Sequence, residues 1–284
     1  MKKNNTGILT VTLFGYAFLY IPLVILMIFS FNESKSVTLW SRFSTKWYHS
    51  LFHNEQLVSA FINSLKVALL SSTLSVSLGL LVSLVIVKFT KFFGRSIFKG
   101  LASAPIVMPE ILLGFAFLML FVFLEDSFGW PVSGSLTTIT LAHTTVAIAY
   151  VTAILTAQLI NVDQSLMEAA LDLGASPVKA FFVITVPIIY PALLGAWLLA
   201  FVLSFDDVVI ASFVSGPEST TLPIVIFSSI RLGLSPEINA FSTLLILVIA
   251  CFIFVVSFLN QRQKNLFQSV QPLEEADVDV ERLP

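Results

Sequence analysis

The segment NVDQSLMEAALDLGASPVKAFFVITVP, residues 161–187, separates two long apolar stretches and carries a helical pattern of its own. Apolar residues recur in its first half at helical spacing: Val162, Leu166, Met167, Ala170 and Leu171. Gly174 can end this helix, because glycine adopts the left-handed conformation without steric cost. Ser176 can then cap a second helix that has Pro177 in its first turn. The segment therefore predicts a short helix, a tight turn, and a helix that continues into the next apolar stretch.

The sequence on both sides of this segment is that of an integral membrane protein. Of its 284 residues, 57% are hydrophobic and 11% charged, whereas a soluble domain is about 25% charged. Six stretches reach the length of about 20 apolar residues that a membrane helix needs: about 7–31, 61–87, 100–124, 138–160, 188–214 and 241–259. We therefore predict an all-α fold with six transmembrane helices. A single transmembrane domain would cover residues 1–264, and an acidic, disordered cytoplasmic tail would cover 265–284.

Positive charges indicate how these stretches cross the membrane. Lysines and arginines precede the first stretch, fill the short link between the second and third, and follow the sixth: Lys2, Lys3, Lys88, Lys91, Arg95, Lys99, Arg262 and Lys264. Loops rich in Lys and Arg stay in the cytoplasm. The first stretch is too long for the apolar region of a signal peptide, which has 7–15 residues. The predicted topology places both termini inside.

Acidic residues interrupt two of the predicted spans. Asp206 and Asp207 lie within AFVLSFDDVVIASFV, residues 200–214, and Glu110 lies in the third span. Each buried charge costs roughly 2.5–3.5 kcal/mol at the bilayer centre, and spans four to six offer no Lys or Arg as a partner. We predict that Glu110 and at least one of the two aspartates line a pathway for a cationic solute; which aspartate does so stays open. The alternative is that these acids are buried hydrogen-bonding groups that hold helices together.

Aromatic residues near these acids could add cation–π contacts to the predicted pathway. The candidates are Phe205, Trp197 and Tyr150. His143, in the fourth span, is interpreted as a hydrogen-bonding link between helices rather than as a proton relay. Small residues follow one face of the second span at every fourth position, which is typical of closely packed membrane helices: Ser71, Ser75, Gly79 and Ser83.

The segment 161–187 also carries a recognisable motif. Glu168-Ala169-Ala170, Gly174 six positions after the glutamate, and Ile184-x-Val186-Pro187 resemble the EAA---G---------I-LP motif of ABC importer permeases, with Val186 in place of leucine. Three further runs are similar to the polyamine (spermidine/putrescine) branch of that family, and within it to putrescine-importer permeases: SFDDVVIASFVSGP (204–217), TTLP (220–223) and RLGLSPEINA (231–240). The resemblance covers residues 7 to about 264 and implies the MetI-like permease fold of a type I importer.

This resemblance implies a function and a set of partners. The chain would be a multi-pass permease of the bacterial inner membrane that moves a polyamine, foremost putrescine, from periplasm to cytoplasm. Its partners would be the lipid bilayer, a second permease subunit in a heterodimer, a dimer of ATP-binding cassette ATPases, and a periplasmic polyamine-binding protein; no nucleic acid is expected. The motif residues would couple the permease to the ATPase: Glu168, Ala169, Ala170, Gly174, Ala175 and Pro187.

The chain itself shows no pattern typical of an enzyme. It has no phosphate-binding G-x-x-x-x-G-K-[ST] motif, no paired His/Cys cluster and no Ser-His-Asp spacing. We therefore assign it no catalytic residue, no metal ligand and no cofactor, and we expect ATP and Mg²⁺ on the partner ATPase. The alternatives are a permease for another cationic solute, such as spermidine or an amino acid, and a secondary transporter driven by an ion gradient. A membrane enzyme using Glu110, Asp206 and Asp207 lacks an accompanying nucleophile–base pair.

Overall fold

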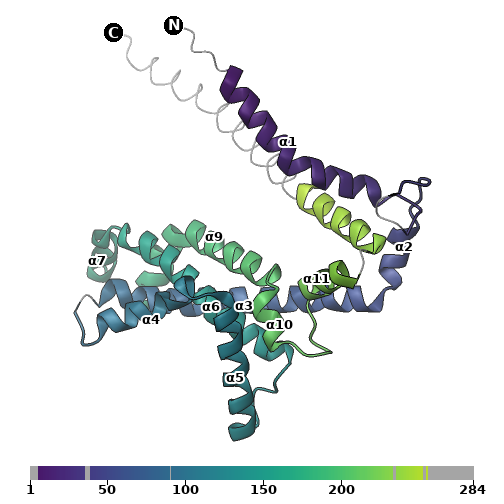
Figure 1. The fold of residues 1–284 in the computed structure, drawn as a ribbon. Helices are drawn as coiled ribbons and strands as arrows, with labels where there is room; N and C mark the ends of the chain where they lie inside the picture. Colours follow the sequence, from purple (N-terminus) through teal and green to yellow (C-terminus); the bar gives the residue numbers. More distant parts are fainter. Residues whose placement is uncertain (1–5, 36–38, 90, 233–234, 252–253, 255–284) are drawn as a thin grey trace, which may run out of the picture. The chain divides into compact units, whose positions relative to one another are not determined.

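The computed structural model describes residues 6–35, 39–89, 91–232, 235–251 and 254, and its described segments are helical apart from turns, loops and isolated bridges (Figure 1). The chain divides into two compact units, and each is described by itself. The first consists of Met1–Asn54 and Gly233–Pro284, and the second of Glu55–Leu232. The predicted tail 265–284 lies outside the described residues.

Five helices among the described residues are long and apolar enough to cross a membrane: Gly7–Phe29, Glu55–Lys88, Glu110–Phe128, Leu136–Ile160 and Pro177–Phe205. The sixth predicted span, 241–259, starts inside the apolar helix Pro236–Cys251 and ends outside the described residues. An all-α membrane fold is therefore confirmed, while the count of six spans and the orientation of the termini stay predictions.

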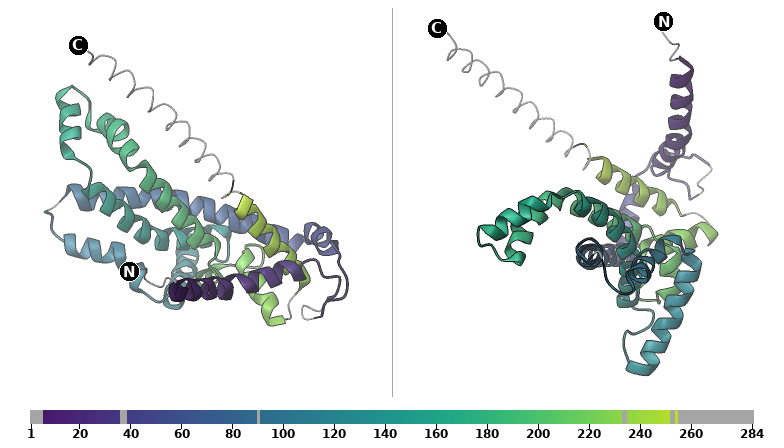
Figure 2. Two further views of the ribbon diagram at one scale, coloured as in Figure 1. Left: turned by 90° about the horizontal axis from the view of Figure 1, so that it is seen from above. Right: turned by 90° about the vertical axis from the view of Figure 1, so that its left-hand side faces the viewer.

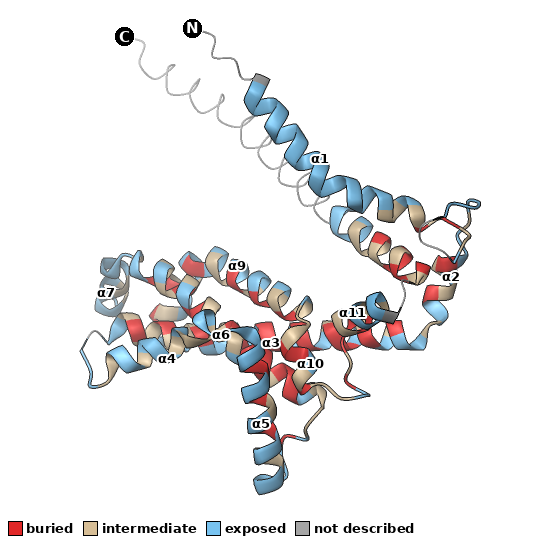
Figure 3. Ribbon diagram, viewed as in Figure 1, coloured by how far each residue is buried: buried red, intermediate tan, exposed pale blue. Residues whose placement is uncertain are grey.

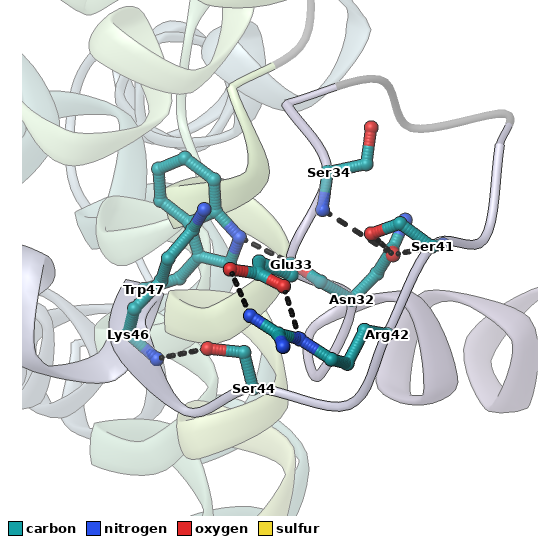
Figure 4. Close-up of polar contacts among 8 residues, drawn as sticks. All are labelled: Asn32, Glu33, Ser34, Ser41, Arg42, Ser44, Lys46 and Trp47. Carbon is teal, nitrogen blue, oxygen red and sulfur yellow. Dashed lines mark hydrogen bonds and ion pairs between the residues drawn. The ribbon is translucent and has the colours of Figure 1, made fainter.

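The first unit contains α1 (Thr6–Phe29), α2 (Lys46–His53) and the helix Pro236–Cys251. Asn32 organises the loop between α1 and α2. Its Nδ2 donates to the Leu39 carbonyl at 2.7 Å, and its Oδ1 accepts from the Ser41 amide at 2.9 Å, a bond that Figure 4 shows. The Trp47 indole, which is buried, donates to the Asn32 carbonyl at 2.7 Å. At its start, helix 236–251 supplies Glu237, whose carboxylate accepts from Asn54 Nδ2 at 2.7 Å.

The core of the second unit is formed by α3 (Glu55–Lys88), α6 (Leu136–Ile160) and α9 (Val186–Phe205). The predicted small-residue face of α3 is buried against its neighbours, as proposed from the sequence. Ser75 Oγ donates to the Thr144 carbonyl and Ser83 Oγ to the Thr152 carbonyl, both at 3.2 Å. Each bond joins residues 69 apart, so α3 and α6 run parallel. Figure 3 shows buried residues gathered along these helices.

Two further pairs show how α9 runs along α3. Ser71 Oγ of α3 donates to Ser204 Oγ at 2.9 Å, and Trp197 Nε1 donates to Thr73 Oγ1 at 3.2 Å. Because the higher number on α3 pairs with the lower number on α9, these two helices are antiparallel. A parallel α3–α6 pair and an antiparallel α9 agree with the direction in which the second, fourth and fifth predicted spans would cross a bilayer.

The predicted third span, 100–124, is divided between two helices, because the chain breaks at Met108–Pro109, beside one of the two prolines in that span. α4 (Arg95–Val107) ends before the break and packs on α6, whereas α5 (Glu110–Phe128) leaves at a steep angle (Figures 1 and 2). Pro109 lacks an amide hydrogen and disfavours helix for the residue before it, which accounts for the extended Met108. α5 packs instead on α10, with Gly114 against the Phe213 ring.

The prediction of a continuous fifth span at 188–214 is wrong beyond Phe205. α9 ends there, with Asp206 as its C-terminal cap, and the short helix α10 (Val209–Val214) follows. α11 (Leu222–Leu232) completes the unit and packs on α3, where the Ser64 hydroxyl accepts from the Leu222 amide at 2.8 Å. The two aspartates therefore lie at a helix break and not in the middle of a helix.

Candidate functional site

The two helix breaks bring predicted pathway residues together. A small cavity of about 40 Å³ is lined by Glu110 and Tyr150, by Asp207, and by His143 and Ser204. Glu110 is the first residue of α5 and Asp207 lies just before α10, so each break contributes one acid. Backbone breaks within membrane helices are tolerated where the freed polar groups are buried in protein or line a cavity. The cavity has room for about two or three waters, and its lining includes no Lys or Arg.

The Asp207 carboxylate is engaged with the first turn of α10. Its Oδ2 accepts from the Ala211 amide at 2.7 Å, and its Oδ1 accepts from the Ile210 amide at 3.4 Å. These are two of the amides that have no partner within their own helix. Asp207 therefore caps α10 and stabilises the break after α9.

His143 joins Asp207 to the core of the unit. Its Nε2 lies 3.2 Å from Asp207 Oδ2, a close contact that is not aligned as a hydrogen bond, and its Nδ1 lies 2.7 Å from Ser204 Oγ. Ser204 in turn accepts from Ser71 Oγ. The interpretation of His143 as a link between helices is thus confirmed. The sequence analysis missed Ser204 in this cluster, although it directly precedes Phe205 and the acids.

Asp206 is placed differently from its neighbour. It is the C-terminal cap of α9 and is exposed, and none of the described residues outside its own backbone bonds to its carboxylate. The structure thus separates the two aspartates, one engaged and one free, which the sequence could not do.

Trp197 and Phe205 lie away from the small cavity, in an aromatic row along α9. Phe201, which the sequence analysis did not single out, stacks between them, with ring centroids 5.5 Å from Trp197 and 5.7 Å from Phe205. The three residues are four apart and therefore share one face of the helix. Phe61 of α3 meets Phe205 edge-on at 6.3 Å. This aromatic row ends directly beside Asp206.

The segment 161–187 folds as its sequence predicts. α7 (Gln164–Asp172) is capped by Asp163, and Gly174 has φ +83°. The Gly174 amide donates to the Leu171 carbonyl at 2.9 Å and the Ala175 amide to the Ala170 carbonyl at 3.0 Å, which is the Schellman pattern for a helix end. Ser176 caps α8 (Pro177–Ala180) by accepting from the Lys179 amide at 3.3 Å.

A π-helical turn joins α8 to α9. η1 (Phe181–Thr185) lies between them, and the Val186 amide donates to the Phe181 carbonyl five residues back. Pro187 lies just after the turn and offers no amide to the carbonyl four residues before it. A π-turn of this kind is rare and is frequent at functional sites. The sequence predicted a helix that continues into the next span but not the change of its winding, for which Pro187 was the available signal.

The motif residues are largely accessible at the surface of this segment. Glu168, Ala169, Gly174 and Pro187 are exposed, whereas Ala170 and Ala175 are half-buried. Three apolar side chains are exposed beside them: Leu166, Leu173 and Val178. Behind α7 lies a cavity of about 480 Å³ that is lined by Met167, Glu168 and residues from the ends of α3 and α6. The motif residues Ala169 and Gly174 are therefore exposed, and Glu168 is exposed at the edge of this cavity.

A family of known proteins matches most of the second unit of this chain and part of the first. The family of binding-protein-dependent transport system inner membrane components matches residues 75–265. The putrescine transport system permease protein PotI of Escherichia coli K12 is 45% identical over 264 residues, which cover 93% of this chain and 94% of that protein. The spermidine/putrescine transport system permease protein PotC of Haemophilus influenzae is 37% identical over 251 residues, covering 88% and 94%.

Solved structures share the fold. A bacterial ABC transporter that imports the acidic polysaccharide alginate contains a chain that matches with a TM-score of 0.67, at 14% identity, over 92% of this chain and 98% of that chain. The alginate transporter in complex with its alginate-bound periplasmic protein matches with a TM-score of 0.65, at 16% identity, over 88% and 91%. At these identities the likeness concerns the fold alone.

Proposed function

The chain belongs to the family of binding-protein-dependent transport system inner membrane components, and on that premise we propose that it is the permease subunit of an ATP-driven importer that carries putrescine into the cytoplasm. It is a MetI-like membrane protein of the inner membrane and a non-enzymatic transport subunit. The observation that carries the substrate assignment is the 45% identity to the E. coli putrescine permease over nearly the full length of both chains.

The chemistry of the acidic cluster supports this substrate class. Putrescine is two ammonium groups joined by methylenes, so it needs negative charge and apolar contact along one path. Glu110 and Asp206 are exposed carboxylates near the two helix breaks, and the aromatic row of Trp197, Phe201 and Phe205 leads to Asp206. An aromatic face contributes about 0.5–2 kcal/mol toward a cation. A few spaced acids bind a cation loosely enough for it to leave again. The small cavity between the breaks cannot hold a diamine, so the solute would pass on the accessible side of Glu110 and Asp206.

Coupling to ATP hydrolysis is assigned to α7 and the turn that follows it. The exposed motif residues Glu168, Ala169 and Gly174 would contact an ATPase subunit, and the π-turn before Pro187 would carry a movement of α7 into α9. The proposed partners are a dimeric ATP-binding cassette ATPase with ATP and Mg²⁺, a second permease subunit in a heterodimer, and a periplasmic polyamine-binding protein. The alginate importer in complex with its alginate-bound periplasmic protein supports this kind of assembly.

The proposal is tested by uptake of labelled putrescine into right-side-out vesicles that contain the chain with its ATPase and second permease, with ATP enclosed and the binding protein added outside. We expect uptake that requires ATP and the binding protein and that survives an ionophore. Uptake that is abolished by the ionophore while ATP is present would instead support the ion-coupled alternative. Omission of this chain alone is the matched control.

Spermidine is the second candidate substrate, because the relatives at 36–37% identity are named spermidine/putrescine permeases. Competition decides between the two. We expect unlabelled putrescine to suppress uptake at lower concentration than spermidine does, and the reverse order would reassign the substrate.

A further inference from the structure

We infer that the two adjacent aspartates have different roles. Asp206 is the carboxylate that meets the cationic solute, whereas Asp207 is a positioning residue that is held by His143 and fixes the break between α9 and α10. The assignment of Asp206 rests on the proposed function, since a cationic solute is what supplies its counter-charge. The assignment of Asp207 and His143 rests on their contacts alone.

The bonding capacity of Asp207 is taken up within the protein. Both oxygens accept amide hydrogens from the first turn of α10, at 2.7 Å from Ala211 and 3.4 Å from Ile210, and Oδ2 also faces His143 Nε2 at 3.2 Å. The Asp207 side chain is 11% exposed. A solute that drew this carboxylate away would leave buried amides of α10 unpaired, which is costly. Asp207 is therefore poorly suited to bind and release a passing cation.

His143 is held so that it can orient Asp207. Its side chain is 3% exposed and sits on α6, and its Nδ1 contacts Ser204 of α9, which is itself bonded to Ser71 of α3. Ser71 donates to Ser204, which leaves the Ser204 hydroxyl hydrogen available for Nδ1; this arrangement is compatible with a neutral imidazole that carries its hydrogen on Nε2, the atom that faces Asp207. Three helices thus converge on one ring, and that ring sets where the carboxylate lies.

Asp206 has the opposite character. It caps the end of α9, is exposed, and receives no bond from another described residue. Its neighbour in sequence, Phe205, is the last ring of the aromatic row, so an exposed carboxylate directly follows an apolar cation-binding face along the chain. This combination suits an alkyl ammonium group, which needs both.

The reaction rates of introduced cysteines test whether positions 206 and 207 differ in exposure, and this measurement does not require transport. In a Cys251→Ser background, Asp206→Cys and Asp207→Cys are each introduced into the full chain, assembled with its partners in membranes, and treated with a cationic, membrane-impermeant methanethiosulfonate. We expect the Asp206→Cys variant to react about tenfold faster or more than the Asp207→Cys variant. Equal rates, or faster reaction at position 207, would overturn the assignment.

Substitutions that separate charge from capping test the roles themselves. Asparagine keeps an oxygen that can accept the α10 amides but removes the charge, and it is a good helix cap. We expect Asp207→Asn to keep more than half of the maximal rate of putrescine uptake and a normal Tm. Asp207→Ala should take up putrescine at less than half of that rate, and its Tm should be about 2–4 °C lower. We expect Asp206→Asn and Asp206→Ala to keep their Tm and to slow uptake alike, by about tenfold or more. Asp126→Asn, an exposed aspartate at the far end of α5, is the matched control.

His143 is tested as a positioning residue by rescue and by a double-mutant cycle. His143→Gln can place an amide N–H where Nε2 lies and should restore most of the uptake per ATP hydrolysed that His143→Ala loses. His143→Ala combined with Asp207→Ala should cost no more than the worse single change, because both remove one interaction. Full additivity, or a loss in His143→Ala that Gln does not restore, would contradict the role.

The outcomes separate this inference from the proposed function. If the wild-type complex does not import putrescine, the proposed function fails, while the thiol rates and the Tm of the 207 variants still decide the role of Asp207. If the complex imports putrescine but Asp206→Asn transports at the wild-type rate, or Asp207→Asn fails as badly as Asp207→Ala at normal Tm, the division of roles is wrong.

Discussion

Gly79 of α3 lies against Val151 of α6 so closely that a Cβ atom added to the glycine would meet Val151 Cγ1 at 2.6 Å. This close contact lies in the α3–α6 seam, between the bonds from Ser75 and Ser83 to the backbone of α6. Without a hydrophobic driving force between helices in lipid, close backbone approach is what holds membrane helices together. The seam therefore depends on the absence of one side chain.

We predict that Gly79→Ala destabilises the chain by about 1–3 kcal/mol, because the added methyl overpacks a filled contact. The measurement is the thermal or denaturant midpoint of the purified chain in detergent. Gly195→Ala on α9 is the control, since its Cβ would meet nothing within 4 Å, and it should be neutral or slightly stabilising. Val151→Ala in the Gly79→Ala background should recover part of the loss; a purely additive result would show that the contact is not the cause.

Gly174 is predicted to matter for coupling through its backbone conformation. Its φ of +83° costs another residue about 1–2 kcal/mol, and no neighbour blocks a Cβ there. Gly174→Val should leave the chain inserted at normal level but lower putrescine uptake per ATP hydrolysed. Gly174→Asn should be milder, because asparagine tolerates this conformation. Equal transport by the valine variant and wild type would show that the turn is dispensable.

Glu168 is predicted to face the ATPase from the exposed side of α7. Glu168→Lys reverses its charge without a packing change, since the residue is exposed. We expect normal insertion, weaker retention of the ATPase on the purified permease, and uptake that falls with it. Lys179, also exposed on the segment, provides the control through Lys179→Gln. Intact ATPase retention in Glu168→Lys would remove this residue from the proposed interface.

The orientation of the chain can be measured directly. We predict that Lys91→Cys and Val132→Cys, each in a Cys251→Ser background, differ in labelling by an impermeant maleimide added to intact cells with a permeabilised outer membrane. Position 132, which is exposed in the loop after α5, should label, and position 91, between α3 and α4, should label only after lysis. The reverse pattern would overturn the inside location of both termini.

Asp163 gives a pH dependence that lies well below neutrality. The Ser165 amide, bonded to its carboxylate at 2.9 Å, lowers the pKa of Asp163. A lowered pKa means that the cap stabilises α7 above the ordinary aspartate value of about 3.9 and is lost as the pH falls below it. Hydrogen exchange at Ser165, corrected for intrinsic rate, should therefore be constant from pH 8 to 5 and rise only below about 4. Asp163→Asn should remove that rise, and an unchanged profile would exclude this cap as its cause.

The sequence was informative where a local rule decides the outcome. Gly174, Ser176 and Pro187 each have a backbone preference that the structure follows, and the fourfold spacing of small residues on α3 predicted the packed seam. The apolar runs, by contrast, predicted the approximate length of the membrane helices but not where a helix is interrupted. Asp206–Val208 interrupts a stretch that reads as unbroken, because that break is stabilised by a distant partner, His143 on α6, whereas the break at Met108–Pro109 has a local cause in Pro109. Which of Asp206 and Asp207 faces the solute depends on the contact between His143 and Asp207. Two adjacent aspartates in a sequence do not reveal that contact.

The equal spacing of the two serine bonds has a mechanical consequence. Ser75 pairs with Thr144 and Ser83 with Thr152, so the same offset holds two turns apart, with the Gly79–Val151 contact between them. Sliding α3 along α6 by one turn would break both hydrogen bonds at once and would place Val151 against a residue other than Gly79. We therefore expect this pair to remain a fixed frame through a transport cycle. Movement would then occur at the two places where the helices are already interrupted, Met108–Pro109 and Asp206–Val208. Glu110 follows the first of these breaks, and Asp206 and Asp207 lie in the second.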